Sequence, residues 1–259
     1  MQTGKEVYGL LVLCLYCTLW LCSCGNADTK PVLTIAGASN MQFALEEISE
    51  AFEAETGIPC RMVTGSSGKL TAQISEGAPY DILVSADVKY PDKLYTEGLT
   101  LGPPRVYAFG KLVLWTALEG IDPDLSVLSR DEIRYIAVAN AKTAPYGQAA
   151  LEVLKYNNLD SALQEKLVFG ESIGQVNQFI RSGSAEIGFT AMSVVSASQF
   201  ESIGRWAALD SLQYKPIEQG VVVIRQKDRK GENALLFEDF LFSESARAIL
   251  RKYGYTTNE

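Results

Sequence analysis

Short apolar runs alternate with amphipathic stretches along most of this 259-residue chain. The apolar runs are only three to five residues long, which favours buried strands over helices. They lie at 32–36, 60–64, 81–85, 136–139, 167–169 and 187–190. Most are followed by a stretch such as 41–56, in which apolar residues recur at helical spacing. The pattern predicts an α/β protein with two successive sets of strands and helices, each built on a mostly parallel sheet.

A longer apolar stretch, 106–116, separates the two sets. We interpret it as a crossing between two lobes, with 221–224 as the return crossing. Two final amphipathic stretches are expected to be helices that pack back on the first lobe, and they cover 232–242 and 244–253. The predicted lobes are 32–107 plus 219–259 for the first, and 108–218 for the second.

The first apolar run, 10–22, differs from the others because it covers 13 residues. A membrane-spanning helix needs about 20, so this run suits the core of a signal peptide. It ends in Leu21-Cys22-Ser23-Cys24, which resembles a bacterial lipobox. We therefore expect a signal peptide over 1–23 and a lipid-anchored tether over 24–31, attached through Cys24. The positive charge before the run is weak, so a plain secretory leader and an uncleaved anchor remain alternatives, and all three export the body.

The composition argues against two classes of function, enzymes and nucleic-acid-binding proteins. The chain has no histidine, a net charge of −8 and a pI of about 4.8. Without histidine, the common nucleophile–base pairs and the commonest zinc ligand are missing, which counts against an enzyme. The acidic balance argues against nucleic acid, because binding to phosphates needs clustered Lys and Arg. Cys60 is the only cysteine after residue 24, and we interpret it as a small buried residue.

Four predicted helices begin at turns of small residues, directly after an apolar strand. The turns are 38–40, 65–68, 144–147 and 171–174. A helix start leaves backbone N–H groups unpaired and carries partial positive charge, so it binds anions without a cationic side chain. Ligands of such sheets bind beyond the carboxyl ends of the strands, where these turns lie. Two turns in each half therefore predict a small oxyanion held between two lobes.

Each turn also has a simpler interpretation as an ordinary helix start. Ser39, Asn40 and Ser67 are of the types that commonly cap helices. Tyr146 follows a proline, which is favoured at the first helical position. Each signal alone is weak, and the prediction rests on the four turns together.

Two other motifs are set aside. The stretch 65–69 contains Gly, Ser and Lys, but it lacks the spacing of a nucleotide-binding P-loop. Asp81 and Asp87 flank an apolar strand, and we expect them to cap or hinge turns rather than to bind a metal.

Several stretches are more distinctive than any helix cap. They are IAGASNMQFALEEISEAFEAETG, GSSGKLTAQISEGAPYDILVSAD, YAFGKLVLW, TAPYGQAALEVL, GESIGQVNQFIRSGSAEIGFTAMS and RAILRKYGY. Together they span about 32–255 and resemble the periplasmic molybdate-binding proteins of ABC importers. The resemblance implies a two-lobed type II periplasmic-binding-protein fold with two crossing strands. Such a protein closes on molybdate or tungstate, needs no other cofactor, and delivers the ion to a membrane permease driven by a cytoplasmic ATPase. We expect a monomer.

The resemblance also implies which residues contact the ion. Hydroxyl contacts fall on Ser39 and Ser67, and in one branch of the family a further contact falls on Asn40. Backbone N–H contacts fall on Tyr146 and Ile173. No residue is expected to ligate the metal atom directly, because the oxygens of the ion face the protein.

One donor of the family is missing. Some members have a tyrosine hydroxyl at the position that is Ala191 here, and Ser193 is a weaker candidate to replace it. Other oxyanions, such as sulfate, remain alternatives. Phosphate is less favoured, because Glu171 is the only carboxylate in the turns that could accept a hydrogen bond from a protonated oxygen. An exported enzyme that uses the same cleft and a sensor lobe that reports its ligand to a membrane partner remain open as well.

Overall fold

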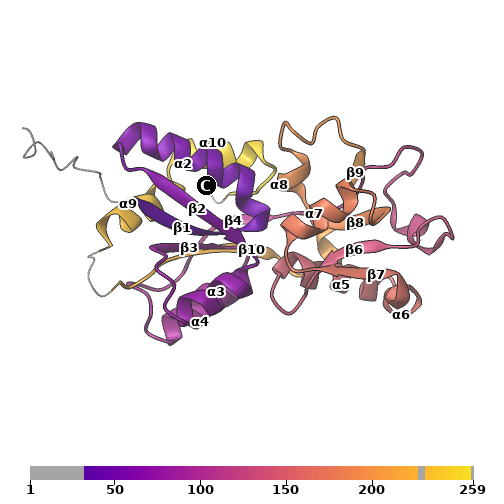
Figure 1. Cartoon of the computed structure of the whole chain (residues 1–259), viewed down its shortest axis with the longest axis horizontal. Coiled ribbons are helices and arrows are strands. Elements are labelled where there is room, and N and C mark those ends of the chain that lie inside the picture. Colours follow the sequence, from indigo (N-terminus) through magenta and orange to yellow (C-terminus); the bar gives the residue numbers. More distant parts are fainter. Residues whose placement is uncertain (1–31, 227–230, 258–259) are drawn as a thin grey trace, which may run out of the picture. The chain divides into compact units, whose positions relative to one another are not determined.

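The computed structural model describes residues 32–226 and 231–257. The predicted signal peptide, the tether and Cys24 lie outside the described residues. Within those residues, no helix is long and apolar enough to span a membrane. The chain folds around two five-stranded sheets, each with its own helices (Figure 1).

The first sheet has the strand order β2-β1-β3-β10-β4. Its strands are β1 (Leu33–Ala38), β2 (Cys60–Gly65), β3 (Ile82–Ser85), β4 (Arg105–Gly110) and β10 (Ile217–Val223). The first three run parallel, with Ile35 of β1 opposite Met62 of β2 and Ile82 of β3. β10 runs antiparallel to both of its neighbours, β3 and β4, so β4 has the same direction as the first three strands.

Helices cover both faces of this sheet. They are η1 (Ser39–Met41), α2 (Gln42–Thr56), α3 (Ser67–Ser75), α4 (Lys89–Thr96), α9 (Glu232–Leu241) and α10 (Glu244–Lys252). In Figure 1, α3 and α4 lie on the opposite face from α2 and α10. The ring of Phe52 in α2 packs edge-on against Phe237 and Phe240 of α9, at centroid distances of 5.0 and 5.5 Å. The C-terminal helices therefore pack on the first set, as the pattern predicts.

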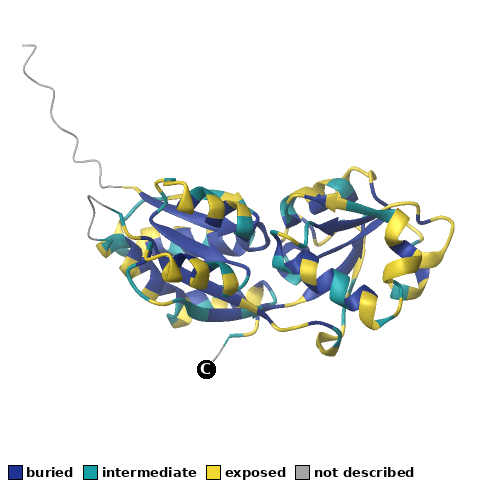
Figure 2. Ribbon diagram, turned by 90° about the horizontal axis from the view of Figure 1, so that it is seen from below, coloured by how far each residue is buried: buried dark blue, intermediate teal, exposed yellow. Residues whose placement is uncertain are grey.

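The second sheet has the order β7-β6-β8-β5-β9. Its strands are β5 (Leu112–Thr116), β6 (Ile136–Ala139), β7 (Leu167–Gly170), β8 (Ile187–Ala191) and β9 (Arg205–Ala208). Its helical segments are η2 (Leu125–Ser129), α5 (Pro145–Tyr156), α6 (Asp160–Leu163), η3 (Gln164–Lys166), α7 (Ile173–Arg181), α8 (Met192–Val195) and η4 (Ser211–Gln213). Central strands are buried and outer helix faces are exposed (Figure 2).

The sheets are mixed, but in each of them four of the five described strands run in the same direction, in agreement with the predicted fold class. In each, two pairings are parallel and two are antiparallel. One strand in each sheet runs opposite to the other four: β10 in the first sheet and β5 in the second. Both belong to the segments that leave one set or return to it. β9 was not predicted from the pattern, because its residues are largely exposed and form no apolar run.

The crossing stretch is also divided differently from the prediction. It forms two strands rather than one, and the change of sheet falls at Lys111, between β4 and β5. The first sheet therefore keeps the chain three residues beyond the boundary expected after residue 107. The return strand β10 begins at Ile217, two residues before the expected boundary at 219, and it belongs wholly to the first sheet.

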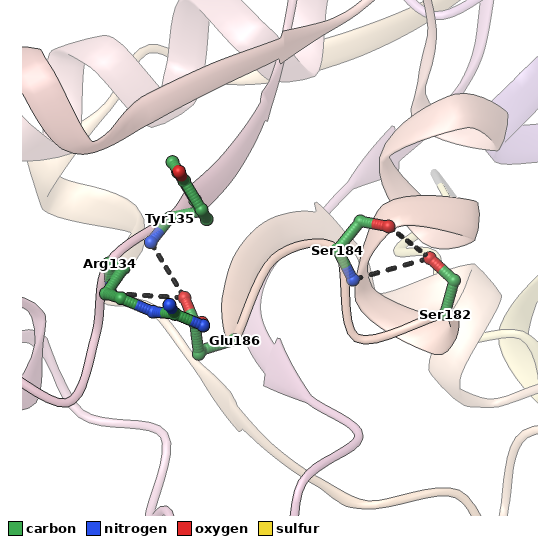
Figure 3. A network of polar contacts seen from close by, with 5 residues as sticks. All are labelled: Arg134, Tyr135, Ser182, Ser184 and Glu186. Carbon is green, nitrogen blue, oxygen red and sulfur yellow. Dashed lines mark hydrogen bonds and ion pairs between the residues drawn. The ribbon is translucent and has the colours of Figure 1, made fainter.

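One of the distinctive sequence stretches has a role in folding. Glu186 is buried just before β8, and its Oε2 accepts hydrogen bonds from the backbone N–H groups of Arg134 (3.1 Å) and Tyr135 (2.7 Å), just before β6 (Figure 3). Nearby, the hydroxyls of Ser182 and Ser184 lie 2.8 Å apart. The bonds of Glu186 join the amino ends of β6 and β8, at the edge of the sheet opposite to the carboxyl ends.

Of the two aspartates set aside from the sequence, Asp87 stabilises a helix start, as expected, whereas Asp81 binds the backbone of strand β1. Asp81 Oδ2 accepts the backbone N–H of Thr34 at 2.7 Å, and Asp87 Oδ1 accepts that of Tyr90 at the start of α4 at 3.3 Å. Among the described residues, no group of three or more His, Cys, Asp or Glu could hold a metal ion. Cys60 is half-buried rather than buried, and desolvation with the nearby charge of Glu53 raises the pKa of its thiol to about 12.

Candidate binding site

The four turns predicted from the sequence come together around one small cavity. We call it the turn cavity, and its lining residues are Ala38, Ser39, Asn40, Gly65, Ser66, Ser67, Ala86, Ala144, Pro145, Tyr146 and Ile173. Two of the turns follow strands of the first sheet and two follow strands of the second. All five predicted contact residues are in this lining, so the structure brings them together.

Four helix starts meet at the turn cavity. The first is that of η1, which continues directly into α2, and the others are those of α3, α5 and α7. None of these helices, as described, has a side-chain hydrogen bond at its cap or an acidic residue in its first turn. The first backbone N–H groups of a helix have no partner within the helix. The aligned peptide dipoles add a partial positive charge at each start. The turn cavity is therefore suited to an anion.

Ser67 is held in a donor orientation. Its side chain is buried, and its Oγ accepts the backbone N–H of Ala86 at 2.9 Å. A hydroxyl has one proton and can accept through its lone pairs, so this bond leaves the Ser67 proton for a ligand. Ala86 follows β3 and was not assigned to the site from the sequence.

Ser39 lies opposite the start of α7. A Cβ built on Gly174 would lie 3.7 Å from both the Cβ and the Oγ of Ser39. Ser39 is 8% exposed. This close approach joins a turn of the first set to a turn of the second, and it leaves room for only small side chains there.

Asn40 directs its side chain away from an incoming anion. Its Nδ2 donates to Gln219 Oε1 and to Tyr255 Oη, both at 2.8 Å. The Gln219 amide in turn donates to the Ala86 carbonyl at 3.1 Å. Both amide hydrogens of Asn40 are therefore engaged, and the group it can still offer to an anion is its backbone N–H.

Ser193 has a different role from the one considered in the sequence. Its Oγ donates to the backbone oxygen of Asn40 at 2.7 Å, and Tyr255 Oη lies 3.0 Å from it. Ser193 is not part of the turn-cavity lining. Its hydroxyl instead connects the start of α8 in the second set to the first turn of the first set.

Tyr146 and Ile173 can offer only backbone groups. A Cβ built on Gly110 would lie 2.0 Å from Tyr146 Oη, so the tyrosine fills space that the glycine leaves at the end of β4. The Tyr146 hydroxyl is buried and makes no hydrogen bond of normal geometry, although it interacts with the hydroxyl of Tyr255. Desolvation raises its pKa well above 10. The Ile173 side chain is apolar and buried, so its N–H at the start of α7 is its only available donor.

In the part of the chain that the structure describes, the turn-cavity lining includes no charged side chain. Lys69 and Glu171 lie next to two of the turns, but both are about half exposed and form an ion pair with each other. Two further bonds join the sets near the cavity: Gly68 N–H donates to the Thr143 carbonyl, and Tyr90 Oη donates to the Lys142 carbonyl, both at 2.9 Å. The turns of the two sets are thus in direct contact.

One polar lining residue was missed. Ser66 is 4% exposed and stands next to Ser67, but the sequence offers no signal that distinguishes two adjacent serines. Burial of its hydroxyl depends on packing between distant segments, which local patterns do not report.

Comparison with known proteins agrees with this fold. A family model described as bacterial extracellular solute-binding protein matches residues 33–256. The Azotobacter vinelandii "Molybdate-binding protein ModA" is 36% identical over 249 residues, 95% of this chain and 96% of that protein. The protein of the same name from Rhodobacter capsulatus is 37% identical over 223 residues, 86% of this chain and 87% of its own.

A solved structure extends the similarity. The "Azotobacter vinelandii periplasmic molybdate-binding protein" superposes with a TM-score of 0.83 at 35% identity, and the match covers 88% of this chain and all of that one. The family model, the sequence identities and the superposition all extend over both sheets. The chain therefore belongs to the bacterial extracellular solute-binding protein family, in the branch of the ModA proteins.

Proposed function

We propose that this protein captures molybdate or tungstate in the turn cavity and delivers it to an ABC permease. The observation that carries the proposal is the lining itself, in which four helix starts converge without any charged side chain. The names of the ModA relatives support the choice of ion. The proposed contacts are the hydroxyls of Ser39 and Ser67 and the backbone N–H groups of Asn40, Tyr146 and Ile173.

The donor set favours an oxyanion that carries no proton. Molybdate is fully deprotonated at neutral pH, whereas inorganic phosphate keeps a proton that needs an acceptor. Glu171, the one carboxylate in the turns, pairs with Lys69 and is not in the lining. Hydrogen bonds to charged groups contribute roughly 1.5–3 kcal/mol each, so five or six of them can offset the desolvation of a dianion.

Capture and release follow from the position of the cavity. An ion that contacts turns of both sets stabilises the arrangement in which they touch, because those contacts are lost when the sets separate. The permease then recognises the loaded arrangement and opens it. The lining offers no nucleophile–base pair, so we propose that the protein binds and releases its ligand unchanged, as a monomer.

Competition titration tests the choice of ion. Purified full-length protein is titrated calorimetrically with molybdate, tungstate, sulfate and phosphate, each alone and then against molybdate. We expect molybdate and tungstate to bind much more tightly than sulfate, and phosphate to bind least. Sulfate is the second candidate, because it too is an unprotonated tetrahedral dianion. If sulfate bound more tightly than molybdate at equal concentration, sulfate and not molybdate would be the ligand.

We also propose that the protein is exported and attached to the membrane by lipid on Cys24. The apolar run of 13 residues and the lipobox-like Leu21-Cys22-Ser23-Cys24 support this. Cys24→Ser should move the protein from the membrane fraction to the soluble fraction of the envelope, with Cys60→Ser as the matched control. Membrane retention of Cys24→Ser would point to an uncleaved anchor, and a wild-type protein already soluble would point to a plain secretory leader.

A further inference from the structure

We infer that the hydroxyl of Ser66 is an additional ligand contact in the turn cavity, next to that of Ser67. The inference rests on the proposed function, because it adds a donor to the same anion site. Ser66 is not one of the five residues proposed above to contact the ion.

Ser66 has a buried hydroxyl with nothing to bind in the described structure. The residue is 4% exposed, it belongs to the lining of the turn cavity, and its Oγ has no hydrogen-bond partner. A buried hydroxyl without a partner is destabilising, because it has lost its bonds to water and gained none in return. An oxyanion in the cavity would accept its proton and remove that deficit.

The helix does not use this hydroxyl either. Ser66 is the cap residue of α3, a position where serine usually accepts an N–H from the first turn. Here its side chain makes no cap bond, and its backbone oxygen alone accepts the N–H of Leu70 at 3.0 Å. Ser243 at the start of α10 behaves normally, since its Oγ accepts the N–H of Ala246 at 3.2 Å. The Ser66 side chain is therefore free for a ligand.

Lack of a partner alone does not mark a ligand contact. Ser49 in α2 and Thr71 in α3 also have buried hydroxyls without partners, and neither lines the turn cavity. The Tyr146 hydroxyl also makes no hydrogen bond of normal geometry, but it lies against Gly110 at the end of β4. Ser66 is distinguished by the combination of an unused serine hydroxyl, burial and a place in the lining.

The test compares Ser66→Ala with Ser49→Ala in full-length protein titrated calorimetrically with molybdate. Both variants remove one unpartnered buried hydroxyl. We expect Ser66→Ala to weaken binding about 10- to 100-fold, the scale of one hydrogen bond to a charged group, and Ser49→Ala to stay within about twofold of wild type. Melting of the free proteins should show neither variant less stable than wild type, because no native hydrogen bond is lost.

The outcomes separate this inference from the proposed function. If wild type binds molybdate and Ser66→Ala binds equally well, the inference is wrong and the proposed function stands. If wild type binds none of the oxyanions, the proposed function fails first. Should Ser66→Ala not fold, Ser66→Cys retains nearly the same volume with a much weaker donor. Its expected loss of affinity is similar, and wild-type affinity in that variant would also overturn the inference.

Discussion

The helices that start at the turn cavity differ in their first turn from the other described α-helices, with the exception of the short α8. α4, α6, α9 and α10 each carry an acidic residue there, and Ser243 additionally caps α10 through its side chain. The helices at the cavity have neither feature. Both features stabilise a helix, by about 0.3–2 kcal/mol each. Their absence at all four starts leaves the N–H groups and the positive ends of the dipoles available to a ligand.

The largest expected effect comes from giving a helix that starts at the turn cavity the acidic first turn of the other helices. Ser172 is the cap residue of α7, and its side chain makes no cap bond. Ser172→Asp supplies a good cap and a negative charge, so we expect the free protein to melt higher. Molybdate binding should weaken by about 3 kcal/mol or more, the scale of charge repulsion near a protein surface. Calorimetry and melting measure the two effects.

Ser172→Asn is the matched control for that experiment. Asparagine caps helices about as well as aspartate but carries no charge. It should keep most of the affinity while it gains similar stability. Equal losses of affinity in both variants would mean that space, and not charge, governs this helix start.

The next effect concerns the two proposed serine donors. Ser67→Ala should weaken molybdate binding by about 2–3 kcal/mol and Ser39→Ala by about 1–2 kcal/mol. The Ser67 hydroxyl is already oriented by the N–H of Ala86, and its loss also leaves that N–H without a partner. Ser67→Ala alone should therefore lower the melting temperature of the free protein. If Ser39→Ala had the greater effect on affinity, the orientation by Ala86 would be unimportant.

A smaller effect separates backbone from side-chain donors. Tyr146→Phe removes a hydroxyl that is buried at the end of β4 and makes no hydrogen bond of normal geometry, while the proposed donor is the backbone N–H. We expect a change of affinity below about 0.5 kcal/mol, a typical size for a substitution that breaks no hydrogen bond of normal geometry. A loss comparable to that of Ser67→Ala, measured by the same titration, would place the hydroxyl among the ligand contacts.

The smallest effect is expected from pH. Among the described residues of the lining, Tyr146 is the only titratable one, and burial raises its pKa well above 10. Tyr255, which bonds to Asn40, has its pKa raised to about 12 by the same cause. Raised tyrosine pKa values keep both groups neutral below pH 10. Molybdate affinity measured between pH 6 and 9 should therefore be nearly constant, and a marked slope would indicate a titrating group at the site.

The sequence predicted the parts of the site that depend on local pattern. Each of the four turns combines small residues with a following amphipathic stretch, and both signals are readable within about 15 residues of chain. The direction of the Asn40 side chain could not be predicted, because its partners Gln219 and Tyr255 are 179 and 215 residues away. The same holds for the hydroxyl of Ser193, which bonds 153 residues back along the chain.

Some strands could be predicted from the sequence and others could not. Runs such as β1 and β6 are buried throughout and apolar enough to be recognised. β9 pairs only with β5, at the edge of its sheet, and its residues are mostly exposed. The break at Lys111 is set by pairing on either side, with β10 for β4 and with β8 and β9 for β5. Pairing partners of this kind are properties of the whole fold.

The small side chains around the turn cavity also have an entropic consequence. A site built from lysine or arginine must immobilise long side chains when the ligand arrives, and each carries about 2 kcal/mol of rotamer entropy. Here Asn40 and Ser67 are already held by hydrogen bonds, and the N–H groups are fixed by their helices. An arriving ion thus orders few side chains, so little of the binding free energy is lost to side-chain entropy.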